Sequence, residues 1–170
     1  YIDKRETMLL ILISIFFLAL CIEILRRNMN KFFNLFNYLF GFMLRNHEIR
    51  GKLTGATWLI IGCVITVMFY DKPIAISAML FLTIGDSIAA IIGKIYPLYR
   101  VGQKTLSGSF FGFFSSFIIV VIFNQTLSPI VILFGAIIAM FLELITTRIN
   151  DNLMIPVFSG FAMMLFDKTI

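Results

Sequence analysis

Six long apolar runs limit what this chain can fold into. A helix needs about 17 to 25 residues to cross the apolar core of a bilayer. The runs that reach or approach that length are Met8 to Leu25, Leu53 to Tyr70, Ile74 to Gly93, Ser109 to Phe123, Pro129 to Thr147 and Leu153 to Phe166. The fourth and sixth are short and need tilt or flanking residues to cross. We therefore expect an all-α, polytopic membrane bundle with about six transmembrane helices.

Composition supports this class. Of the 170 residues, 60% are hydrophobic and 14% are charged, which excludes an ordinary soluble domain. No linker or internal repeat divides the chain, so residues 1–170 are expected to form a single domain. The first apolar run lacks a small-residue cleavage site and is interpreted as a membrane anchor. Because the chain opens at Tyr1 and not at a methionine, we expect upstream residues to be missing.

The segment between the first two runs has a different pattern. Asn30, Asn34, Asn37 and Gly41 recur at spacings of four, three and four, which places them on one face of a helix, while phenylalanines cover the rest. Its roughly 13 apolar residues are too few to span a bilayer. The pattern predicts a helix from Lys31 to Leu44 that lies in the membrane interface.

The cations give an orientation. If the first run ends in the cytoplasm, six crossings place ten of the fourteen Lys and Arg residues on that side: Arg26, Arg27, Lys31, Arg45, Arg50, Lys52, Lys94, Arg100, Lys104 and Arg148. The opposite side keeps Lys4, Arg5, Lys72 and Lys168. Lys and Arg in short loops mark the cytoplasmic side. We therefore expect an integral protein of a bacterial or archaeal cell membrane, or of an ER-type membrane if the source is eukaryotic, with its polar loops in the cytoplasm.

Small residues recur at helical spacing where helices are expected to meet. The stripes are Gly85, Ala89 and Gly93; Gly51 and Gly55; and Gly108 and Gly112. Such spacings are typical of close contacts between membrane helices. The first stripe runs beside Asp86, so tight packing there would keep this acid in the protein interior.

Asp86 and Glu143 are acids inside apolar runs. An aspartate within a membrane costs roughly 2.5 to 3.5 kcal/mol on insertion scales, so such a residue is a functional candidate. Asp86 precedes Lys94 by eight residues, and Glu143 precedes Asp151 by eight, which predicts a similar depth for the two acids. They are candidates to share a divalent ion or a proton. The alternatives are ion pairs: Asp86 with a lysine or arginine, and Glu143 with Arg148 or Lys94.

Two polar segments follow these acids. The first is the KTLSGS segment, Lys104 to Ser109, which offers hydroxyls and backbone amides for a phosphate. Three cations lie in or before it: Lys94, Arg100 and Lys104. The segment does not match a Walker motif. Asn150, Asp151 and Asn152 precede an apolar run and are typical of a helix N-cap. The alternative for this turn is a polyphosphate site whose acid holds a metal ion.

Four blocks in order carry a family resemblance: LRNHE followed by KLTGAT, then GDSIAAIIGK, KTLSGS and DNLMIP. Together they span Leu44 to Pro156. The sequence resembles the CTP-dependent lipid-alcohol kinases, which include dolichol kinase, phytol kinase and the fungal-type diacylglycerol kinase, and which are distantly similar to phosphatidate cytidylyltransferases. The family segment commonly reads KTxEGS, whereas this chain has Ser107 in place of the glutamate.

The resemblance implies site residues and ligands. It implies nucleotide-binding positions at Lys94, Lys104, Thr105, Gly108, Ser109 and Asn152, metal positions at Asp86 and Asp151, and a further site residue at Glu48. The depth argument adds Glu143 as a metal position, and Arg45, in the same charged segment as Glu48, is a further candidate. Asp86 and Lys104 are the expected catalytic residues. The implied ligands are Mg²⁺, CTP as donor and a membrane lipid alcohol as acceptor, with no nucleic acid.

These cations, acids and backbone amides suit phosphoryl transfer to a hydroxyl, because that reaction depends on positioning and charge stabilisation. A CDP-lipid-forming cytidylyltransferase and a transporter or scaffold remain alternatives. The oligomeric state stays open, with a homodimer among the expectations.

Overall fold

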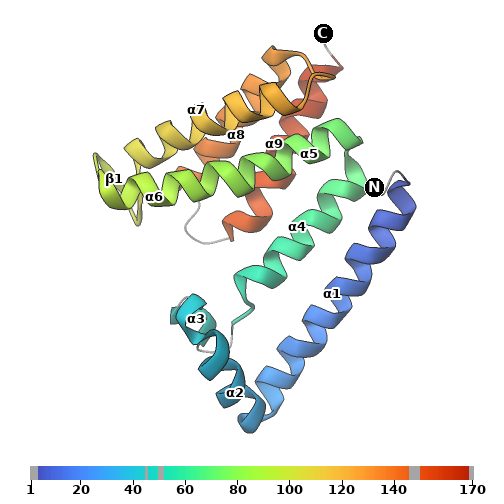
Figure 1. The fold of residues 1–170 in the computed structure, drawn as a ribbon, viewed down its shortest axis with the longest axis vertical. Helices are drawn as coiled ribbons and strands as arrows, with labels where there is room; N and C mark the ends of the chain where they lie inside the picture. Colours follow the sequence, from blue (N-terminus) through green and yellow to red (C-terminus); the bar gives the residue numbers. More distant parts are fainter. Residues whose placement is uncertain (1–3, 45, 50–51, 146–149, 169–170) are drawn as a thin grey trace.

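The computed structural model describes residues 4–44, 46–49, 52–145 and 150–168. The described chain is helical apart from one short antiparallel hairpin (Figure 1), so the expected all-α class is confirmed. The elements in chain order are α1 (Arg5–Asn28), α2 (Asn30–Phe40), η1 (Gly41–Met43), α3 (Asn46–Ile49), α4 (Gly55–Phe69), α5 (Lys72–Leu80), η2 (Phe81–Asp86), α6 (Ser87–Ile95), β1 (Arg100–Val101), β2 (Lys104–Thr105), α7 (Leu106–Phe123), α8 (Pro129–Ile145) and α9 (Asp151–Asp167).

Within the described residues, three helices are long and apolar enough to cross a membrane. They are α1, the continuous helix Lys72–Ile95 made of α5, η2 and α6, and α7. The helices α4 and α8 are apolar but shorter. Only 6% of the most apolar 18-residue stretch of α1 is buried inside the protein. Most side chains of this helix therefore face outward. These features indicate an integral membrane protein with several spans.

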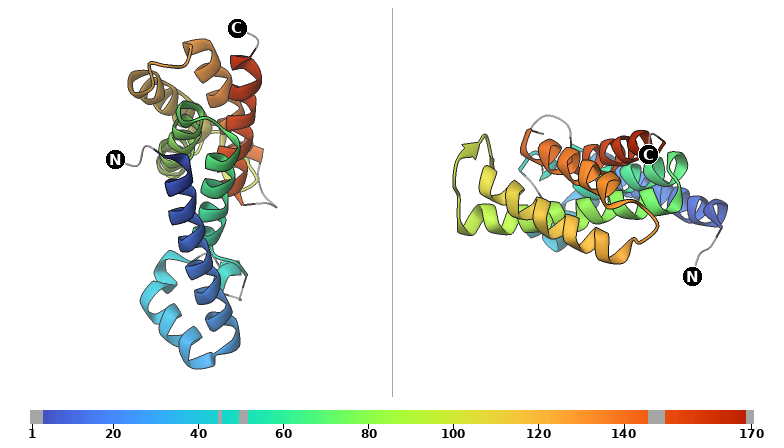
Figure 2. Two further views of the ribbon diagram at one scale, coloured as in Figure 1. Left: turned by 90° about the vertical axis from the view of Figure 1, so that its right-hand side faces the viewer. Right: turned by 90° about the horizontal axis from the view of Figure 1, so that it is seen from above.

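The helices form two connected parts, a bundle of α5 to α9 and an arm of α1 to α4 (Figures 1 and 2). In the bundle, α8 packs on α9 and α7, and α6 packs on α7. The helix α4 joins the two parts because it packs on both α1 and α9. The ends of helices that the cation pattern assigns to the cytoplasm, including the start of α4 and the end of α6, lie toward the left and lower side of Figure 1.

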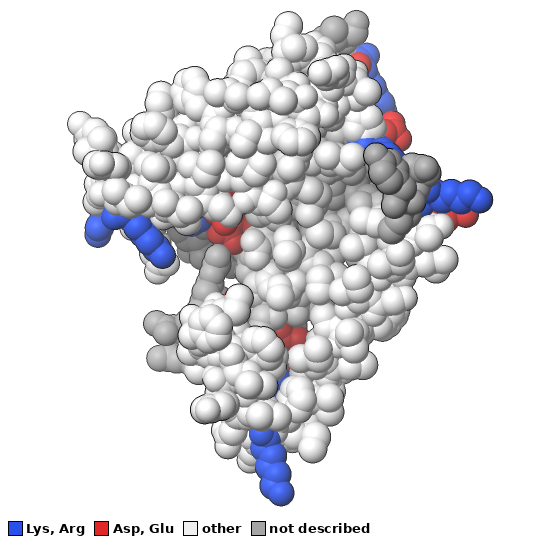
Figure 3. Space-filling view, viewed as in Figure 1, with Lys and Arg blue, Asp and Glu red and all other residues white. Residues whose placement is uncertain are grey.

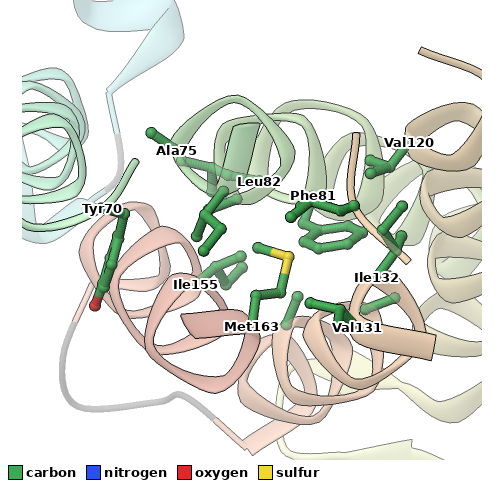
Figure 4. Packing of buried hydrophobic residues seen from close by; sticks show 14 of the residues in the cluster. Tyr70, Ala75, Phe81, Leu82, Val120, Val131, Ile132, Ile155 and Met163 are labelled. Carbon is green, nitrogen blue, oxygen red and sulfur yellow. The ribbon is translucent and has the colours of Figure 1, made fainter. Parts of the chain in front are cut away.

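The apolar core lies inside the bundle. Phe81 of η2, Val131 and Ile132 of α8, and Ile155 and Met163 of α9 are all buried and point toward one another (Figure 4). Tyr70 closes one side of this core, and its hydroxyl donates a hydrogen bond to the carbonyl of Val157 at 2.6 Å. The core fixes η2, α8 and α9 against one another, and these elements carry the acids described below.

Glycines set the close approach of α6 and α7. A methyl group added at Gly112 would lie 2.6 Å from the Gly85 carbonyl oxygen, and one added at Gly93 would lie 2.5 Å from Thr105 Oγ1. Gly108 packs directly on the Ala89 carbonyl. The predicted packing role is therefore confirmed for the stripe from Gly85 to Gly93 and for that of Gly108 and Gly112, whereas Gly51 of the remaining stripe lies outside the described residues.

The segment around Lys104 differs in detail from the expectation. Lys104 and Thr105 lie in strand β2, paired with β1 across a turn in which Gly102 has a φ of 62°, and α7 begins at Leu106, before the predicted start at Ser109. A left-handed φ at this turn suits glycine, which lacks a Cβ. The predicted helix from Lys31 to Leu44 is confirmed as α2 followed by η1. Its position in the membrane interface stays a prediction.

A candidate active site around Lys104

The Lys104 side chain is the centre of a cluster of three carboxylates. Its ammonium lies 3.1 Å from Asp86 Oδ1, 2.8 Å from Glu143 Oε1 and 3.2 Å from Asp151 Oδ2. These acids come from three different elements, since Asp86 ends η2, Glu143 lies in α8 and Asp151 begins α9. The structure thus brings together both predicted intramembrane acids, one acid of the predicted polar turn and the lysine of the KTLSGS segment.

The side chains of this cluster differ in burial, and their charges do not cancel. Glu143 and Asp151 are almost fully buried, whereas the side chains of Asp86 and Lys104 each keep 22% of their exposure. Three carboxylates against one ammonium leave two formal negative charges. Burial lowers the pKa of the Lys104 ammonium, but the charges of the surrounding carboxylates raise it by more, so the pKa lies above its ordinary value. Lys104 is therefore a permanent cation at neutral pH.

A π-helical segment and small residues position Asp86. The six residues of η2 interrupt an otherwise continuous α-helix, and Asp86 is the last of them. A widened helical turn of this kind is frequent at functional sites. Gly85 allows Met140 and Ser116 to approach closely, so that η2 lies tightly against α7 and α8. Packing of the neighbouring residues thus holds the aspartate beside Lys104.

The remaining acids are held by hydrogen bonds. The Ser109 hydroxyl on α7 lies 2.5 Å from Glu143 Oε2, which links α7 to α8 inside the cluster. Asn150 caps α9, because its side-chain oxygen accepts a hydrogen bond from the Asn152 amide at 3.0 Å. The expected N-cap of this turn is therefore confirmed. It presents Asp151 to Lys104 as the first residue of the helix.

A second polar cluster, which the sequence reasoning missed, lies between α1 and the start of α4. Glu23 and Arg26 are nearly fully buried and form an ion pair at 2.7 Å. Glu23 Oε1 accepts hydrogen bonds from the Thr54 amide and the Thr57 hydroxyl, and Arg26 donates to the carbonyl of Glu48 at 2.9 Å. An acid within the first apolar run, three residues before an arginine, is the sequence signal that would have found this pair.

Glu48 and Asn152 lie at the junction of the arm and the bundle. Glu48 Oε1 accepts a hydrogen bond from the Gly55 amide at 2.8 Å, and Asn152 Nδ2 donates to the Gly55 carbonyl at 2.9 Å. Both predicted site residues thus meet at the first residue of α4. Because Asn152 directly follows Asp151, this junction and the Lys104 cluster both use the start of α9.

Other predicted site residues lie outside the cluster. Thr105 caps α7 by accepting a hydrogen bond from the Gly108 amide at 3.2 Å, and both residues are buried between α6 and α7. Their contacts in the structure are those of helix capping and packing. Lys94 is exposed near the end of α6. Arg45 and Arg148 lie outside the described residues, and Glu143 pairs with Lys104 and not with Lys94.

Ser107, where the family pattern commonly has glutamate, does not face the acids. Its hydroxyl lies 2.5 Å from the carbonyl of Tyr96, and it accepts a hydrogen bond from the Leu98 amide at 3.2 Å. Ser107 therefore fixes the turn that follows α6. The carboxylates that contact Lys104 are those of Asp86, Glu143 and Asp151.

Acidic atoms are visible between the bundle and the arm (Figure 3). Figure 3 shows acidic atoms in the recess between the α6 end of the bundle and the α2–α3 part of the arm, with basic side chains at its edge. Among the described residues, no three His, Cys, Asp or Glu side chains are arranged as a ready-made metal site. The carboxylates are spread around the ammonium of Lys104 instead.

Comparison with known proteins supports the expected resemblance. The chain is 24% identical over 115 residues to the CTP-dependent diacylglycerol kinase 1 of Eremothecium gossypii, and 28% identical over 105 residues to that of Saccharomyces cerevisiae. This chain is distantly similar to CTP-dependent diacylglycerol kinases. The matches cover 66% and 60% of this chain but only 36% of each kinase.

The expected resemblance is therefore confirmed at the level of distant similarity. An uncharacterized protein of Rickettsia prowazekii is 29% identical over 160 residues, which are 89% of this chain and 78% of that protein. No family model and no solved structure matches the chain.

Proposed function

We propose that this protein is a membrane-embedded lipid kinase that transfers the terminal phosphoryl group of a nucleotide, CTP in preference to ATP, to the hydroxyl of a membrane lipid alcohol. The observation that carries the proposal is the convergence of Asp86, Glu143 and Asp151 on Lys104. Two of these acids lie in apolar helices. An ionised group is energetically costly there, so such a residue usually has a function. The similarity to CTP-dependent diacylglycerol kinases supports the choice of reaction and donor.

The proposed reaction needs a proton acceptor and a cation. The lipid hydroxyl oxygen forms a bond to the terminal phosphorus, the bond from that phosphorus to the bridging oxygen breaks, and the nucleoside diphosphate leaves. Asp86 is the proposed acceptor of the hydroxyl proton because it is the most accessible acid of the cluster. Lys104 has a flexible side chain whose ammonium turns from the carboxylates to the phosphate oxygens and stabilises their charge.

The cluster has the donor chemistry of a Mg²⁺ site. Carboxylate oxygens are the ligands that this ion prefers, and the two formal negative charges left beside Lys104 match its charge. Asp86, Asp151 and Glu143, which surround the Lys104 ammonium in the structure, would hold it once that ammonium has turned to the phosphate. When bound, Mg²⁺ would supply positive charge at the phosphate oxygens.

The proposal includes a membrane topology. Each of the six apolar runs contains a helix, and we propose that all six cross the bilayer, with the Lys104 cluster toward the cytoplasmic side where the nucleotide is available. The helix α2 would lie in the interface on that side. A homodimer stays a prediction that a measurement of mass in detergent tests.

Label transfer from CTP decides between the reaction classes. Purified protein is incubated with lipid alcohols of the diacylglycerol, polyprenol and phytol types, and with CTP labelled at either the α- or the γ-phosphate. We expect lipid labelled from the γ-position only, with unlabelled ATP competing weakly. Lipid labelled from the α-position would identify a cytidylyltransferase. Absence of lipid label with every acceptor would overturn the enzyme assignment and leave a transporter or scaffold.

A further inference from the structure

The segment that joins α6 to α7 is exposed along its whole length. We call residues 95–103 the joining segment, and each of them is exposed. The β1–β2 hairpin in this segment projects from one end of the bundle, beyond α6 and α7 (Figures 1 and 2). Its exposed large apolar or aromatic side chains are Ile95, Tyr96, Leu98, Tyr99 and Val101. A concentration of such side chains marks a surface that contacts a partner or a membrane.

The backbone of the joining segment is fixed, although its side chains are exposed. Ser107 on α7 anchors the first turn, because its hydroxyl lies 2.5 Å from the Tyr96 carbonyl oxygen and 3.2 Å from the Leu98 amide nitrogen. The Leu106 amide donates a hydrogen bond to the Tyr99 carbonyl at 3.0 Å, and the pairing of β1 with β2 closes the hairpin. A fixed backbone keeps the exposed side chains in one arrangement, which lowers the entropic cost of binding a surface.

Tyr99 has a backbone conformation that costs conformational energy. Its φ is 49°, in the left-handed region that residues with a Cβ rarely adopt. Residues that are held in such conformations cluster at functional positions. Tyr99 also has the most exposed large apolar or aromatic side chain of the joining segment, at 81%. The two observations together indicate that the Tyr99 ring has a function outside the protein interior.

The joining segment carries a positive charge that nearby acids do not neutralise. Arg100 is its one charged residue, and Lys94 directly precedes it. The sequence has no Asp or Glu between Asp86 and Glu143, and these two acids contact Lys104 instead. An exposed arginine beside aromatic rings is typical of the headgroup level of a membrane, where the guanidinium binds phosphate.

The two helices that flank the joining segment expose apolar side chains next to it. The helix Lys72–Ile95, which ends in α6, and α7 are both long and apolar enough to cross a membrane. Near the joining segment they expose Ile91 on α6, and Phe110 and Phe111 on α7. Exposed apolar residues thus extend along the chain from both helix ends into the hairpin. A bilayer fits this surface, with acyl chains along the helices and headgroups at the hairpin.

We propose that the joining segment binds the headgroup region of the membrane and selects anionic phospholipid, with the Arg100 guanidinium on a lipid phosphate and the Tyr96 and Tyr99 rings at the level of the glycerol groups. A zwitterionic lipid carries its own cation beside the phosphate, so an unpaired arginine favours a lipid with net negative charge. The selected lipid is a component of the surrounding leaflet and takes no part in a reaction. The inference needs neither nucleotide nor phosphoryl transfer and is therefore independent of the proposed function.

Quenching of tryptophan fluorescence by brominated lipids tests the joining segment directly. Trp58 is the one tryptophan of the chain, so Tyr99→Trp in a Trp58→Phe background reports on position 99 alone. The purified variant is placed in phosphatidylcholine nanodiscs that contain a rising fraction of brominated phosphatidylglycerol or, in a second arm, of brominated phosphatidylcholine. We expect half-maximal quenching at an about fivefold lower fraction of phosphatidylglycerol, the effect of one arginine at an anionic surface. Molar salt should reduce this preference, because it screens exposed charges.

Matched variants make the test specific to Arg100. Arg100→Gln in the reporter background should bring the two lipids to within about twofold of each other, because it removes the charge that selects phosphate. Lys31→Gln removes the same charge from an exposed position of α2, in the arm, and should leave the preference unchanged. Thermal unfolding of each variant shows that it is folded.

Two further reporter positions control for the depth and for the substitution itself. Phe114→Trp, also in the Trp58→Phe background, places the reporter at an exposed position in the middle of α7, where the two lipids should quench equally. The sequence has no Lys or Arg between Lys104 and Arg148, so no cation of this stretch selects lipid there. Tyr96→Trp is a second reporter within the joining segment and should show the same preference as Tyr99→Trp.

The outcomes separate this inference from the proposed function. If neither lipid quenches the reporters at positions 96 and 99, the joining segment faces water and the inference is wrong. Equal quenching by the two lipids, or an equal loss of preference in Arg100→Gln and Lys31→Gln, overturns the assigned phosphate contact. The expected preference in a protein that transfers no phosphoryl group keeps this inference and rejects the kinase.

Discussion

Lys104 forms ion pairs with acids of three elements, η2, α8 and α9. It therefore has a structural role as well as the proposed catalytic role. A buried ion pair contributes little net stability, because desolvation offsets much of the attraction, whereas removal of one partner leaves an uncompensated charge. Around Lys104 the imbalance is large, since one ammonium faces three carboxylates. The cluster is therefore sensitive to loss of the cation and less sensitive to loss of any one acid.

Lys104→Ala should destabilise the protein by about 3 to 5 kcal/mol, because it leaves buried carboxylates without a counter-charge. Thermal unfolding in detergent measures this change. Millimolar Mg²⁺ should restore more stability to Lys104→Ala than it adds to the unchanged protein, since the ion replaces the lost charge. Lys104→Arg, which keeps the charge, is the control and should unfold near the unchanged protein. An unaltered melting temperature in Lys104→Ala would contradict the charge assignment.

Asp86→Asn should leave the protein folded and abolish phosphoryl transfer. The Lys104 ammonium keeps Glu143 and Asp151 as partners, so no cation is left unpaired and the stability loss stays below that of Lys104→Ala. Melting temperature and lipid phosphorylation are measured on the same preparation. An Asp86→Asn protein that is stable and fully active would remove Asp86 from the chemistry.

Alkaline pH should have little effect on the Lys104 cluster. The pKa of Lys104 is raised in the folded protein, mainly by its carboxylate neighbours against the effect of burial. A lysine whose pKa is raised by folding stabilises the folded protein fully at any pH below its pKa in the unfolded chain, about 10.4. This stability is lost only as the pH rises through the higher pKa of the folded protein. Melting temperatures at pH 7 and pH 9 should therefore agree for this cluster. A difference between them that disappears in Lys104→Ala would show that Lys104 titrates in this range.

At the scale of elements, a close glycine contact holds η2, which ends in Asp86, against α7, which follows Lys104 and Thr105. Gly112→Ala should destabilise the protein by about 1 to 3 kcal/mol, because the added methyl would lie 2.6 Å from the Gly85 carbonyl oxygen and backbone cannot yield easily. Gly41→Ala is the matched control, since no atom lies within 4 Å of the added methyl and the φ of −57° suits alanine. Equal melting temperatures for the two variants would contradict the close-contact role.

The elements also show what could be predicted from the sequence. Apolar runs and glycine stripes predicted the helices and their close contacts, because these depend on local composition and spacing. Counting eight residues back from the charged ends placed Asp86 and Glu143 at one depth, and both reach the same ammonium. The choice of Lys104 as their partner depends on the hairpin and on the order of the helices in the bundle, which local patterns do not encode.

Other features were beyond sequence reasoning for a different physical reason. The π-helical turn of η2 depends on packing against α7, α8 and α9, and no residue of Phe81–Asp86 alone requires it. Thr105 and Gly108 read as phosphate-binding residues in the sequence, although in the structure they cap and pack α7. Glu23 carried the same signal as Asp86, an acid in an apolar run, and its partner Arg26 stood three residues away.

For the whole molecule, the position of the charged cluster relative to the bilayer decides whether a nucleotide has access to it. Exposed Gln103 in the β1–β2 turn and exposed Gln125 between α7 and α8 lie at opposite ends of α7 and are the positions for a topology test. Cys21 and Cys63 are first replaced, because Cys21 is exposed and would react with a thiol reagent. Each glutamine is then changed to cysteine separately.

In sealed vesicles of known orientation, a membrane-impermeant maleimide should label Gln103→Cys only from the cytoplasmic side and Gln125→Cys only from the other side. The reason is the distribution of cations, ten of which fall on the proposed cytoplasmic side. The two sites control for each other, since α7 must cross the bilayer for them to react from opposite faces. Labelling of Gln103→Cys from outside would place the Lys104 cluster away from cytoplasmic nucleotide, and the proposed kinase reaction would then lack its donor.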